Sequence, residues 1–596
     1  MIRELFSLLD NHQRKQFYTL QFLVVVMACM ELVGIASIAP FMALVGDIGL
    51  LEKEGIYSTL YYWSGIENPK DFLFYSGLVV LFTLTCSTII SMFTIWKLSL
   101  FGTRVGVEIA DRLYTHYMHQ NWLFHAGASS AQLTKQVSTE ALRVTNGIIQ
   151  PLMHLNAKAT LAFFISISII IYNPWIAFLG LMLFSISYFI LYKIVRKRLQ
   201  INGQKLSEVS TKRFRLMNEG FGGIKDILLL NRSYDFVDRF KRNGIIFAYA
   251  QGTNNSISQV PRYFMELIAF GAMISLVLLL LKLHQGNLGV VLPTLAVYAL
   301  AAFKLLPALQ QIYSSITQIK GNAAAFDSIK NDLTLSLKVP ELLTQYNELE
   351  CLPFKEKINL RNITFSYPGK SNPAVYNLNM IIPVNSVIGI VGASGSGKST
   401  TIDLLLGLLA PQQGEMYVDN MRITETNVRA WQNTLGFVPQ SIYLSEGTIA
   451  ENVAFGLPAK DINLDQVNNA IKLANLTELV NQLPGGVHTK VGERGVQLSG
   501  GQRQRIGIAR ALYNEAEVLV FDEATSALDG ITEKIIMDAI HNFSGKKTII
   551  MIAHRLKTVR KCDIIYMMEQ GKVIDQGTYE QLLETNPKFK EMAEHA

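Results

Sequence analysis

The chain has 596 residues, of which 49% are hydrophobic and only 17% are charged. This composition is too apolar for an ordinary soluble protein, and the length exceeds what one compact core usually holds, so a multidomain membrane protein is predicted. The formal net charge is only +7, and the sequence has no arginine-rich arm. Both features argue against a nucleic-acid partner. The cysteines have neither metal nor disulfide spacing and are interpreted as small hydrophobic residues or free thiols; they are Cys29, Cys86, Cys351 and Cys562.

The N-terminal segment over residues 1–16 is mixed polar, with Leu5, Phe6, Leu8 and Leu9 spaced to form one apolar face of a short helix. Such a helix is predicted to lie on the membrane surface as an interfacial helix. The segment lacks the basic, then apolar, then small-residue order of a cleaved secretion signal. We therefore expect it to be retained.

Six long apolar segments follow, each close to the ~20 residues that a helix needs to cross a bilayer. They are Phe17–Val45, Phe72–Phe101, Gly147–Tyr172, Trp175–Ile194, Val260–Leu281 and Val290–Leu309. The hydropathy falls after the last of them. We predict a six-helix transmembrane domain over 17–320, a linker over 321–357 and a second domain over 358–596.

The charge of the connecting segments orients these spans. Segments 102–146 and 195–259 carry 4 and 12 Lys or Arg residues, whereas 46–71, 173–174 and 282–289 carry 2, 0 and 1. Positive charge marks the cytoplasmic side, so both chain ends and the second domain are predicted to be cytoplasmic. The two basic segments are rich in helix formers, and we expect them to extend the membrane helices beyond the bilayer.

Between the first two spans, Ile56, Leu60 and Trp63 recur at i, i+4 and i+7, beside Tyr57 and Tyr61. This spacing predicts a short amphipathic helix over 55–64 at the outer interface, where Trp and Tyr are favoured. Two roles stay open for it: an interfacial anchor, or a surface that touches the tail of a lipid.

In the second domain, a glycine-rich loop stands between an apolar strand over 387–391 and an apolar helix from 402. The loop consists of Gly392, Ala393, Ser394, Gly395, Ser396, Gly397, Lys398, Ser399 and Thr400. Inward-facing backbone N–H groups, the helix N-terminus and Lys398 suit nucleotide phosphates, and Ser399 suits Mg²⁺. The loop predicts ATP binding. Because similar patterns occur in unrelated glycine-rich loops, the prediction depends on the motifs that accompany it.

A second apolar strand, over 518–521, ends in the carboxylates Asp522 and Glu523. The carboxyl end of a buried parallel strand is a common ligand site. Asp522 suits Mg²⁺ and Glu523 suits the alignment of an attacking water, because phosphoryl transfer needs charge neutralisation and an oriented nucleophile. A polar run precedes this strand and leads into a basic helix: Ser499, Gly500, Gly501 and Gln502.

The glycine loop, the run Leu498–Gln502 and the acidic strand, in this order, resemble the ATP-binding cassette (ABC) family. The resemblance implies that Tyr367 stacks on adenine and that Gln440 senses the γ-phosphate and Mg²⁺. It also implies that 526–529 form the D-loop and that His554 is the switch histidine of hydrolysis. Taken singly, these positions have ordinary alternatives: a surface tyrosine, a turn glutamine and a structural histidine.

The resemblance implies a fold class as well: an all-α six-helix transmembrane domain joined to an α/β P-loop nucleotide-binding domain. ATP with Mg²⁺ would be hydrolysed between the loop of one cassette and the Ser499–Gln502 run of another, which requires a dimer. Because this chain supplies every motif, a homodimer is expected. Segments 121–125 and 231–236 are candidate coupling helices that dock on the nucleotide domains; alternatively, their aromatic residues only pack against the bundle.

Over the whole chain, the sequence resembles the PglK-type flippases of bacterial lipid-linked oligosaccharides. The similarity rests on Glu31 ahead of Gly34–Phe41, on Val260–Tyr263 at the start of the fifth span, and on the external segment. It implies an ATP-driven flippase of the cytoplasmic (inner) membrane, in contact with lipid substrate and membrane lipid. Two alternatives stay open: an exporter of a lipid A-like glycolipid or hydrophobic drug, and an ATP-gated regulator without transport. Intact Glu523 and His554 favour turnover.

Three of the basic residues within the predicted spans stand out as candidates to face a substrate cavity: Lys97, Arg262 and Lys304. A charge in hydrocarbon is costly unless it faces a cavity or a partner. Lys304 has no acidic residue within its own span, so we predict that Arg262 and Lys304, doubled by the dimer, hold the pyrophosphate of the lipid. Alternatively, Arg262 pairs with Glu266 along its own helix and Lys97 extends to the interface.

Overall fold

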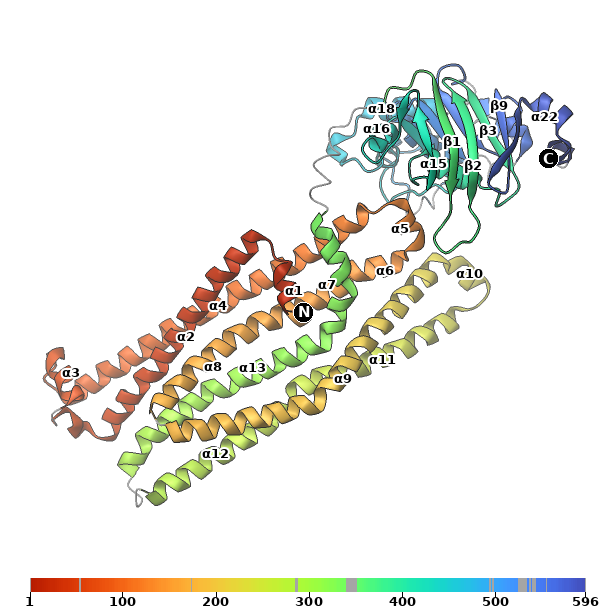
Figure 1. Cartoon of the computed structure of the whole chain (residues 1–596). Helices are drawn as coiled ribbons and strands as arrows, with labels where there is room; N and C mark the ends of the chain where they lie inside the picture. The colour runs from red at the N-terminus through yellow and green to blue at the C-terminus, as the bar shows by residue number, and fades with distance from the viewer. Residues whose placement is uncertain are drawn as a thin grey trace. The chain divides into compact units, whose positions relative to one another are not determined.

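The computed structural model describes residues 2–594 apart from 53–54, 173, 284–287, 339–350, 493–494, 496–497, 524–532, 535–536, 539–542 and 554. The chain divides into two compact units. The first comprises Met1–Gln120 and Gly127–Pro340, and the second comprises Asn121–Ala126 and Glu341–Ala596. The first unit is helical, and the second is built on β-sheets (Figure 1).

Long helices make up most of the first unit (Figure 1). They are α2 (Asn11–Gly46), α4 (Pro69–Met118), α8 (Gln150–Tyr172), α9 (Pro174–Gly222), α11 (Ser233–Gln259), α12 (Pro261–Leu283) and α13 (Leu288–Leu335). The shorter helices are α1 (Ile2–Ser7), α3 (Ile56–Ser64), α6 (Ser130–Lys135), α7 (Ala141–Val144) and α10 (Ile224–Leu229).

The membrane spans expected from hydropathy correspond to helices of this unit. Within the described residues, four helical stretches are long and apolar enough to cross a membrane: Asn11–Gly46, Pro69–Met118, Ser130–Ile171 and Ala177–Gly222. Helices α12 and α13 cover the fifth and sixth predicted spans. Helices α4 and α9 contain 50 and 49 residues, which at about 1.5 Å per residue gives more than twice the thickness of the hydrocarbon core. The predicted extension of membrane helices beyond the bilayer is therefore present.

The end of the helical unit differs from the boundary predicted at residue 320. Helix α13 continues to Leu335, where the predicted linker over 321–357 should already have begun. Its last turns are amphipathic, with Phe326, Ile329 and Leu333 fully buried. Their three- to four-residue spacing forms one apolar stripe along the helix. A window that averages hydropathy cannot separate such a helix from a polar linker.

The N-terminal segment also differs from the surface helix predicted over 1–16. Leu5, Leu8 and Leu9 are buried and line small pockets together with Val105 and Ile109 of α4. Glu4 forms an ion pair of 2.6 Å with Lys330 of α13. The apolar face of α1 therefore packs on the helical unit, because long neighbouring helices offer it an apolar surface.

The second unit contains two sheets. The four-stranded antiparallel sheet has the order β2-β1-β4-β5, and the six-stranded sheet has the order β10-β9-β3-β8-β7-β6. All pairs in the larger sheet are parallel except β9 with β10. The strands are β1 (Lys357–Phe365), β2 (Val375–Pro383), β3 (Val387–Gly392), β4 (Gln413–Val418), β5 (Met421–Arg422), β6 (Leu435–Val438), β7 (Val518–Asp522), β8 (Thr548–Ile552), β9 (Ile564–Glu569) and β10 (Lys572–Gly577).

Helices cover these sheets and complete the α/β architecture (Figure 1). They are α15 (Lys398–Leu405), α16 (Val428–Gln432), α17 (Ile449–Val453), α18 (Leu464–Leu473), α19 (Thr477–Gln482), α20 (Gly500–Leu512), α22 (Tyr579–Thr585) and α23 (Pro587–Glu594). Strands β3 and β8 are buried at every position, as expected for central parallel strands. A helical unit with an α/β unit is the fold class that the sequence predicts.

The two candidate coupling segments both contain helix. Helix α5 (Trp122–Gly127) falls almost entirely in the second unit, and Leu123 packs against the core of that unit. The segment 231–236 begins α11, where Arg232 pairs with Asp235 at 3.1 Å. The structure thus associates the first candidate with the α/β unit, as a coupling helix requires.

Candidate functional site

The predicted phosphate loop runs from the end of β3 to the start of α15, and its backbone admits only glycine at two positions. Gly392 has φ 152°, and a Cβ there would lie 2.2 Å from the carbonyl oxygen of Met568. Gly397 has φ 101°, and its Cβ would lie 2.6 Å from the carbonyl oxygen of Ala374. The loop therefore folds tightly against the chain, in conformations that side chains disfavour.

The N-terminus of α15 is open to an anion. Its N-cap is Gly397, which provides no side-chain hydrogen bond, so the first backbone N–H groups have no side-chain acceptor. The hydroxyl of Ser396 is buried and has no hydrogen-bond partner in the described structure. Unpaired donors at a helix N-terminus match the phosphate oxygens of a nucleotide. These residues therefore fit ATP.

Lys398 is the cation of this loop. Its ammonium donates to the carbonyl oxygens of Gly392 at 2.9 Å and Ala393 at 3.0 Å. Burial lowers the pKa of Lys398, while the negative charges of Glu523 and Asp522 raise it. Strand β7 contacts α15, and the charges of Asp522 and Glu523 at its end act on Lys398, as the sequence predicts for a strand that ends near the phosphate loop.

The carboxyl ends of β6 and β7 bring Gln440 and Glu523 together. The two strands are parallel neighbours, and Nε2 of Gln440 donates to Oε2 of Glu523 at 2.6 Å. Glu523 adopts a left-handed backbone with φ 50° directly after β7. Ser399, Gln440 and Asp522 are the residues that would hold Mg²⁺ together with nucleotide oxygens, as is usual for this ion. Bound Mg²⁺ would supply neutralisation of the phosphate charge.

The predicted adenine-stacking residue lies beside the loop helix. The hydroxyl of Tyr367 is 3.3 Å from Oγ1 of Thr400, and its ring meets Phe365 edge-on at 5.1 Å. Its side chain is half-buried. Stacking on adenine stays a prediction.

The run Ser499–Gln502 starts α20. Ser499 and Gln502 cap the helix reciprocally, with Gln502 N–H donating to Ser499 Oγ at 3.2 Å and Ser499 N–H donating to Gln502 Oε1 at 2.8 Å. Ser499 is exposed, so a second nucleotide domain can reach this helix N-terminus. Two other predicted elements, the D-loop over 526–529 and His554, lie outside the described residues.

The sequence analysis missed Asp403, which is half-buried on α15. Burial raises the pKa of Asp403 to about 6; a hydrogen bond from the side chain of Trp122 opposes this effect, and the charge of Asp522 adds to it. The signal in the sequence is a single carboxylate within the apolar run of the loop helix. Asp403 and Trp122 therefore connect the phosphate-loop helix to α5.

In the helical unit, the three predicted cavity cations all have neighbours of suitable chemistry. Arg262 pairs with Glu266 along α12 at 2.6 Å, which was the alternative to a cavity role. Lys97 lies 5.3 Å from the ring centroids of both Phe93 and Trp96. Lys304 pairs with Glu31 of α2 at 2.7 Å. The acidic partner of Lys304 thus comes from the first span, so the sequence of the sixth span alone could not reveal it.

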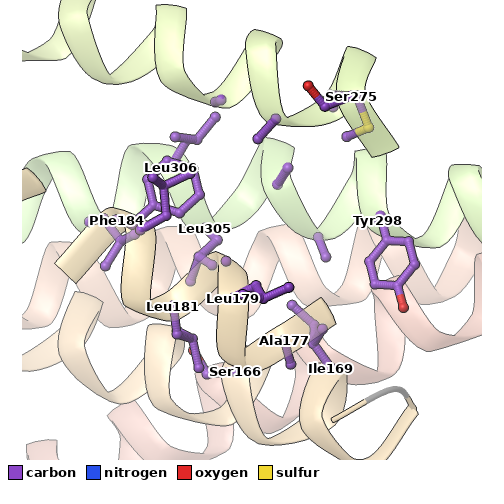
Figure 2. Close-up of a pocket in the computed structure, with 18 residues that line it drawn as sticks. Ser166, Ile169, Ala177, Leu179, Leu181, Phe184, Ser275, Tyr298, Leu305 and Leu306 are labelled. Carbon is purple, nitrogen blue, oxygen red and sulfur yellow. The ribbon is translucent and has the colours of Figure 1, made fainter. Parts of the chain in front are cut away.

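A pocket of about 380 Å³ lies between α8, α9, α12 and α13. Figure 2 shows Phe184, Leu305 and Leu306 among the side chains that line it. The lining is apolar apart from three hydroxyl-bearing residues: Ser166, Ser275 and Tyr298. The helices of this unit therefore enclose space suited to a hydrophobic group.

Two family models match the chain. The model of the ABC transporter transmembrane region matches residues 22–303, and the ABC transporter model matches residues 375–526. A solved bacterial Atm1-family ABC exporter with ATP bound has the same fold, with a TM-score of 0.76. That likeness covers 98% of this chain and 99% of the other at 21% sequence identity.

Two curated proteins illustrate the relatives. The chain is 41% identical over 257 residues to ABC transporter B family member 2 of Dictyostelium discoideum, covering 43% of this chain but only 18% of that longer protein. It is 30% identical over 469 residues to the ATP-dependent lipid A-core flippase of Bordetella pertussis, covering 77% of this chain and 72% of that protein. The chain therefore belongs to the ATP-binding cassette transporters, as an exporter half-transporter that couples ATP hydrolysis to transport across a membrane.

Proposed function

We propose that the chain flips a lipid-linked oligosaccharide, a glycan on a polyisoprenoid pyrophosphate, across the inner membrane at the expense of ATP. The observation that carries the proposal is the ion pair of Lys304 with Glu31, in a helical unit that also contains a large apolar pocket. A cation inside a membrane domain is costly and usually serves a substrate or ion path. An amphipathic substrate with an anionic head matches both features.

The other cations support an anionic headgroup as well. The Arg262 side chain is 54% exposed despite its pairing with Glu266, and Lys304 is 39% exposed despite its pairing with Glu31. Both can therefore exchange a carboxylate partner for a phosphate. In the homodimer these residues occur twice and would form the basic belt that takes the pyrophosphate, while the pocket between the helices would take part of the tail.

A lipid A-like glycolipid is the second candidate, because the relative from Bordetella pertussis is named a lipid A-core flippase. Lipid A and polyisoprenoid pyrophosphates share an anionic phosphate beside sugar and long apolar chains. The two differ in the tail, which is multiply acylated in one and a single isoprenoid chain in the other. The features of the helical unit suit both, so substrate competition must separate them.

The energy source is proposed to be a homodimer with two ATP sites. Each site would combine the phosphate loop of one chain with the Ser499–Gln502 run of its partner, in which Ser499 is exposed. Six spans with a basic cytoplasmic face would place both nucleotide domains in the cytoplasm, where ATP is available. The alternative, an ATP-gated regulator, would use ATP as a switch without moving lipid.

The test uses the purified full chain in proteoliposomes that contain either fluorescent lipid-linked oligosaccharide or fluorescent lipid A. Translocation is followed by the loss of access of a membrane-impermeant quencher. ATP-dependent flipping of the lipid-linked oligosaccharide, faster than that of lipid A, is expected. Preferential flipping of lipid A would select the second candidate, and ATP hydrolysis without flipping of either lipid would favour a regulator.

The same assay tests the basic belt. The Arg262→Ala/Lys304→Ala double variant should lose most flipping while its basal ATPase activity changes little. The matched control is Lys212→Ala/Arg242→Ala, which removes two exposed cations of α9 and α11. Unchanged flipping in a well-folded double variant would remove the belt from the proposal.

A further inference from the structure

Glu31 is the centre of a polar cluster that joins helices of the membrane domain. It is buried on α2, and both of its carboxylate oxygens have partners. Oε2 accepts the ion pair from Lys304 of α13 at 2.7 Å, and Oε1 accepts a hydrogen bond from Oγ of Ser91 on α4 at 2.8 Å. Charge-assisted bonds of this kind are strong inside a low-dielectric interior. Glu31 is therefore held in one orientation, aimed at Lys304.

A second lysine adds its charge to the electrostatics of this ion pair. Lys158, half-buried on α8, interacts electrostatically with both Glu31 and Lys304. His154, one helical turn earlier on α8, interacts with Lys158. Among the described residues of this cluster, the single negative charge of Glu31 is thus opposed by one lysine in contact with it and a second lysine that it influences electrostatically. A buried charge without compensation is costly, so an additional anion would be favoured here.

Apolar space lies next to this cluster. A pocket of about 160 Å³ is lined by α2, α8 and α13, and its walls include Leu32, the residue after Glu31, and Ala301, one turn before Lys304. Ile169 and Tyr298 line both this pocket and the larger one of Figure 2. A ligand with an anionic head and a long apolar tail therefore has a charged end and an apolar end in adjacent turns of the same helices.

We propose that Glu31 is an internal counter-anion that neutralises Lys304 until a phosphate of the lipid substrate takes its place. This inference deepens the proposed function and rests on it, because it names a residue that determines which headgroups enter. Phosphate carries about −1.5 to −2 charges at neutral pH and so competes with a single carboxylate for two lysines. A neutral headgroup does not compete, and a free anion gains nothing from the apolar space.

As a counter-anion, Glu31 would determine which headgroups bind. A purely structural ion pair would have no such effect on lipid binding. Replacing Glu31 by Gln removes the competing charge but keeps the size of the side chain and the hydrogen bond with Ser91. Binding of a phosphorylated lipid should then become tighter. A carboxylate that only joins α2 to α13 would instead lower stability when replaced, with no gain in affinity.

The test measures binding to the purified full chain in nanodiscs. The probes are a fluorescent polyisoprenyl phosphate, the polyisoprenol of the same length, and inorganic pyrophosphate as a competitor. For Glu31→Gln we expect phosphate-lipid binding about tenfold tighter than for the unmodified chain, since charged hydrogen bonds contribute on that scale. Polyisoprenol binding should not change, and pyrophosphate should compete weakly in both proteins.

Three variants complete the experiment. Glu208→Gln is the matched control, because it removes a carboxylate from an exposed pair with Lys212 and should leave binding unchanged. Lys304→Gln should weaken phosphate-lipid binding, and Glu31→Gln/Lys304→Gln should lose the gain of the single Glu31 variant. A gain that persists in the double variant would show that Glu31 does not act through Lys304.

The outcomes separate this inference from the proposed function. Tighter phosphate-lipid binding in Glu31→Gln, together with no flipping of any lipid, would support the counter-anion and contradict the flippase. Normal flipping with unchanged or weaker binding in a well-folded Glu31→Gln would overturn the counter-anion and leave the flippase intact. Competition by pyrophosphate as strong as by the lipid would assign the cluster to free anions and overturn the lipid-specific role.

Discussion

At the scale of single residues, the contact between Gln440 and Glu523 at the edge of the parallel sheet is the basis of the catalytic prediction. Glu523→Gln keeps the shape of the side chain but removes the charge that would align a water against the γ-phosphate. We expect ATP binding to persist and steady-state hydrolysis to fall at least about 100-fold, as for the loss of a general base. Phosphate release and equilibrium binding of a fluorescent ATP analogue measure the two effects.

Two further variants sharpen this prediction. Lys398→Ala should weaken nucleotide binding itself, by losing a charge-assisted contact worth about 1.5–3 kcal/mol. Glu580→Gln, an exposed carboxylate at the start of α22, is the matched control and should hydrolyse ATP normally. A Glu523→Gln protein with near-normal turnover would remove Glu523 from its assigned role.

Asp403 gives a prediction on pH. Because burial raises its pKa to about 6, the folded protein keeps a proton on Asp403 between about pH 4 and 6 that the unfolded chain releases near pH 4. The stability contributed by this group is therefore full below pH 4 and falls as the pH rises to 6. Asp403→Asn should remove this slope and raise the apparent unfolding temperature at pH 7.

The hydrogen bond from Trp122 supplies the second arm of the pH experiment. It lowers the pKa of Asp403, so Trp122→Phe should raise that pKa and move the fall in stability to higher pH. Thermal unfolding of the full chain, followed by intrinsic fluorescence from pH 4 to 8, measures the shift. Asp461→Asn serves as an exposed control. Identical pH profiles for Asp403→Asn and the unmodified protein would contradict the prediction.

At the scale of helices, α9 and α13 approach closely at a pair of glycines. A Cβ on Gly203 would lie 2.4 Å from the carbonyl oxygen of Gly321, and backbone cannot move aside cheaply. We expect Gly203→Ala to destabilise the helical unit, because overpacking costs about 1–3 kcal/mol, more than the ~0.5–1 kcal/mol that alanine gains in a helix.

Gly180, which like Gly203 belongs to α9, is the matched control, since nothing lies within 4 Å of a Cβ placed there. Gly180→Ala should leave the apparent unfolding temperature unchanged or slightly raised. Both variants are compared in the same detergent by a thermal-shift assay. Equal stability of the two variants would show that the close approach of α9 and α13 does not constrain the packing.

Hydropathy and motif order predicted the elements of this chain well where each element carries its own signal. The strand, loop and helix around Lys398 form as expected, because buried parallel strands and glycine loops are encoded locally. The last turns of α13 and the burial of Leu5 were not predicted, since both depend on neighbouring helices rather than on local composition. The partner of Lys304 was missed for the same reason: Glu31 belongs to a different span.

At the scale of the whole molecule, the nucleotide site could be predicted further than the substrate site. The motifs that hold ATP have a fixed order and chemistry, and the structure brings Gln440 and Glu523 together. The order of apolar residues in a span does not reveal which face meets a cavity. The pocket between α8, α9, α12 and α13 and the cluster around Glu31 depend on how the helices pack. They could therefore be identified only from the structure.

The proposed homodimer gives the last prediction. If nucleotide lies between two chains, a cysteine in the phosphate loop should crosslink to a cysteine at the start of α20 of the partner. Ser394→Cys and Gly500→Cys suit this test, because Ser394 is exposed and Ser396 is buried. Native Cys562 does not interfere, since burial raises the pKa of its thiol to about 12. The other native thiols are first replaced by serine: Cys29, Cys86 and Cys351.

Mixing the two single-cysteine proteins before reconstitution makes the crosslink diagnostic of the dimer. We expect a band of twice the chain mass after mild oxidation, stronger with ATP in a Glu523→Gln background, because bound nucleotide would draw the two domains together and would not be hydrolysed. Neither single-cysteine protein alone should give this band. In the proposed dimer, the two copies of one position would belong to two different ATP sites and would not face each other. The shared site would be refuted by a protein that light scattering shows to be monomeric, that keeps full ATPase activity, and that gives no crosslink in the mixture.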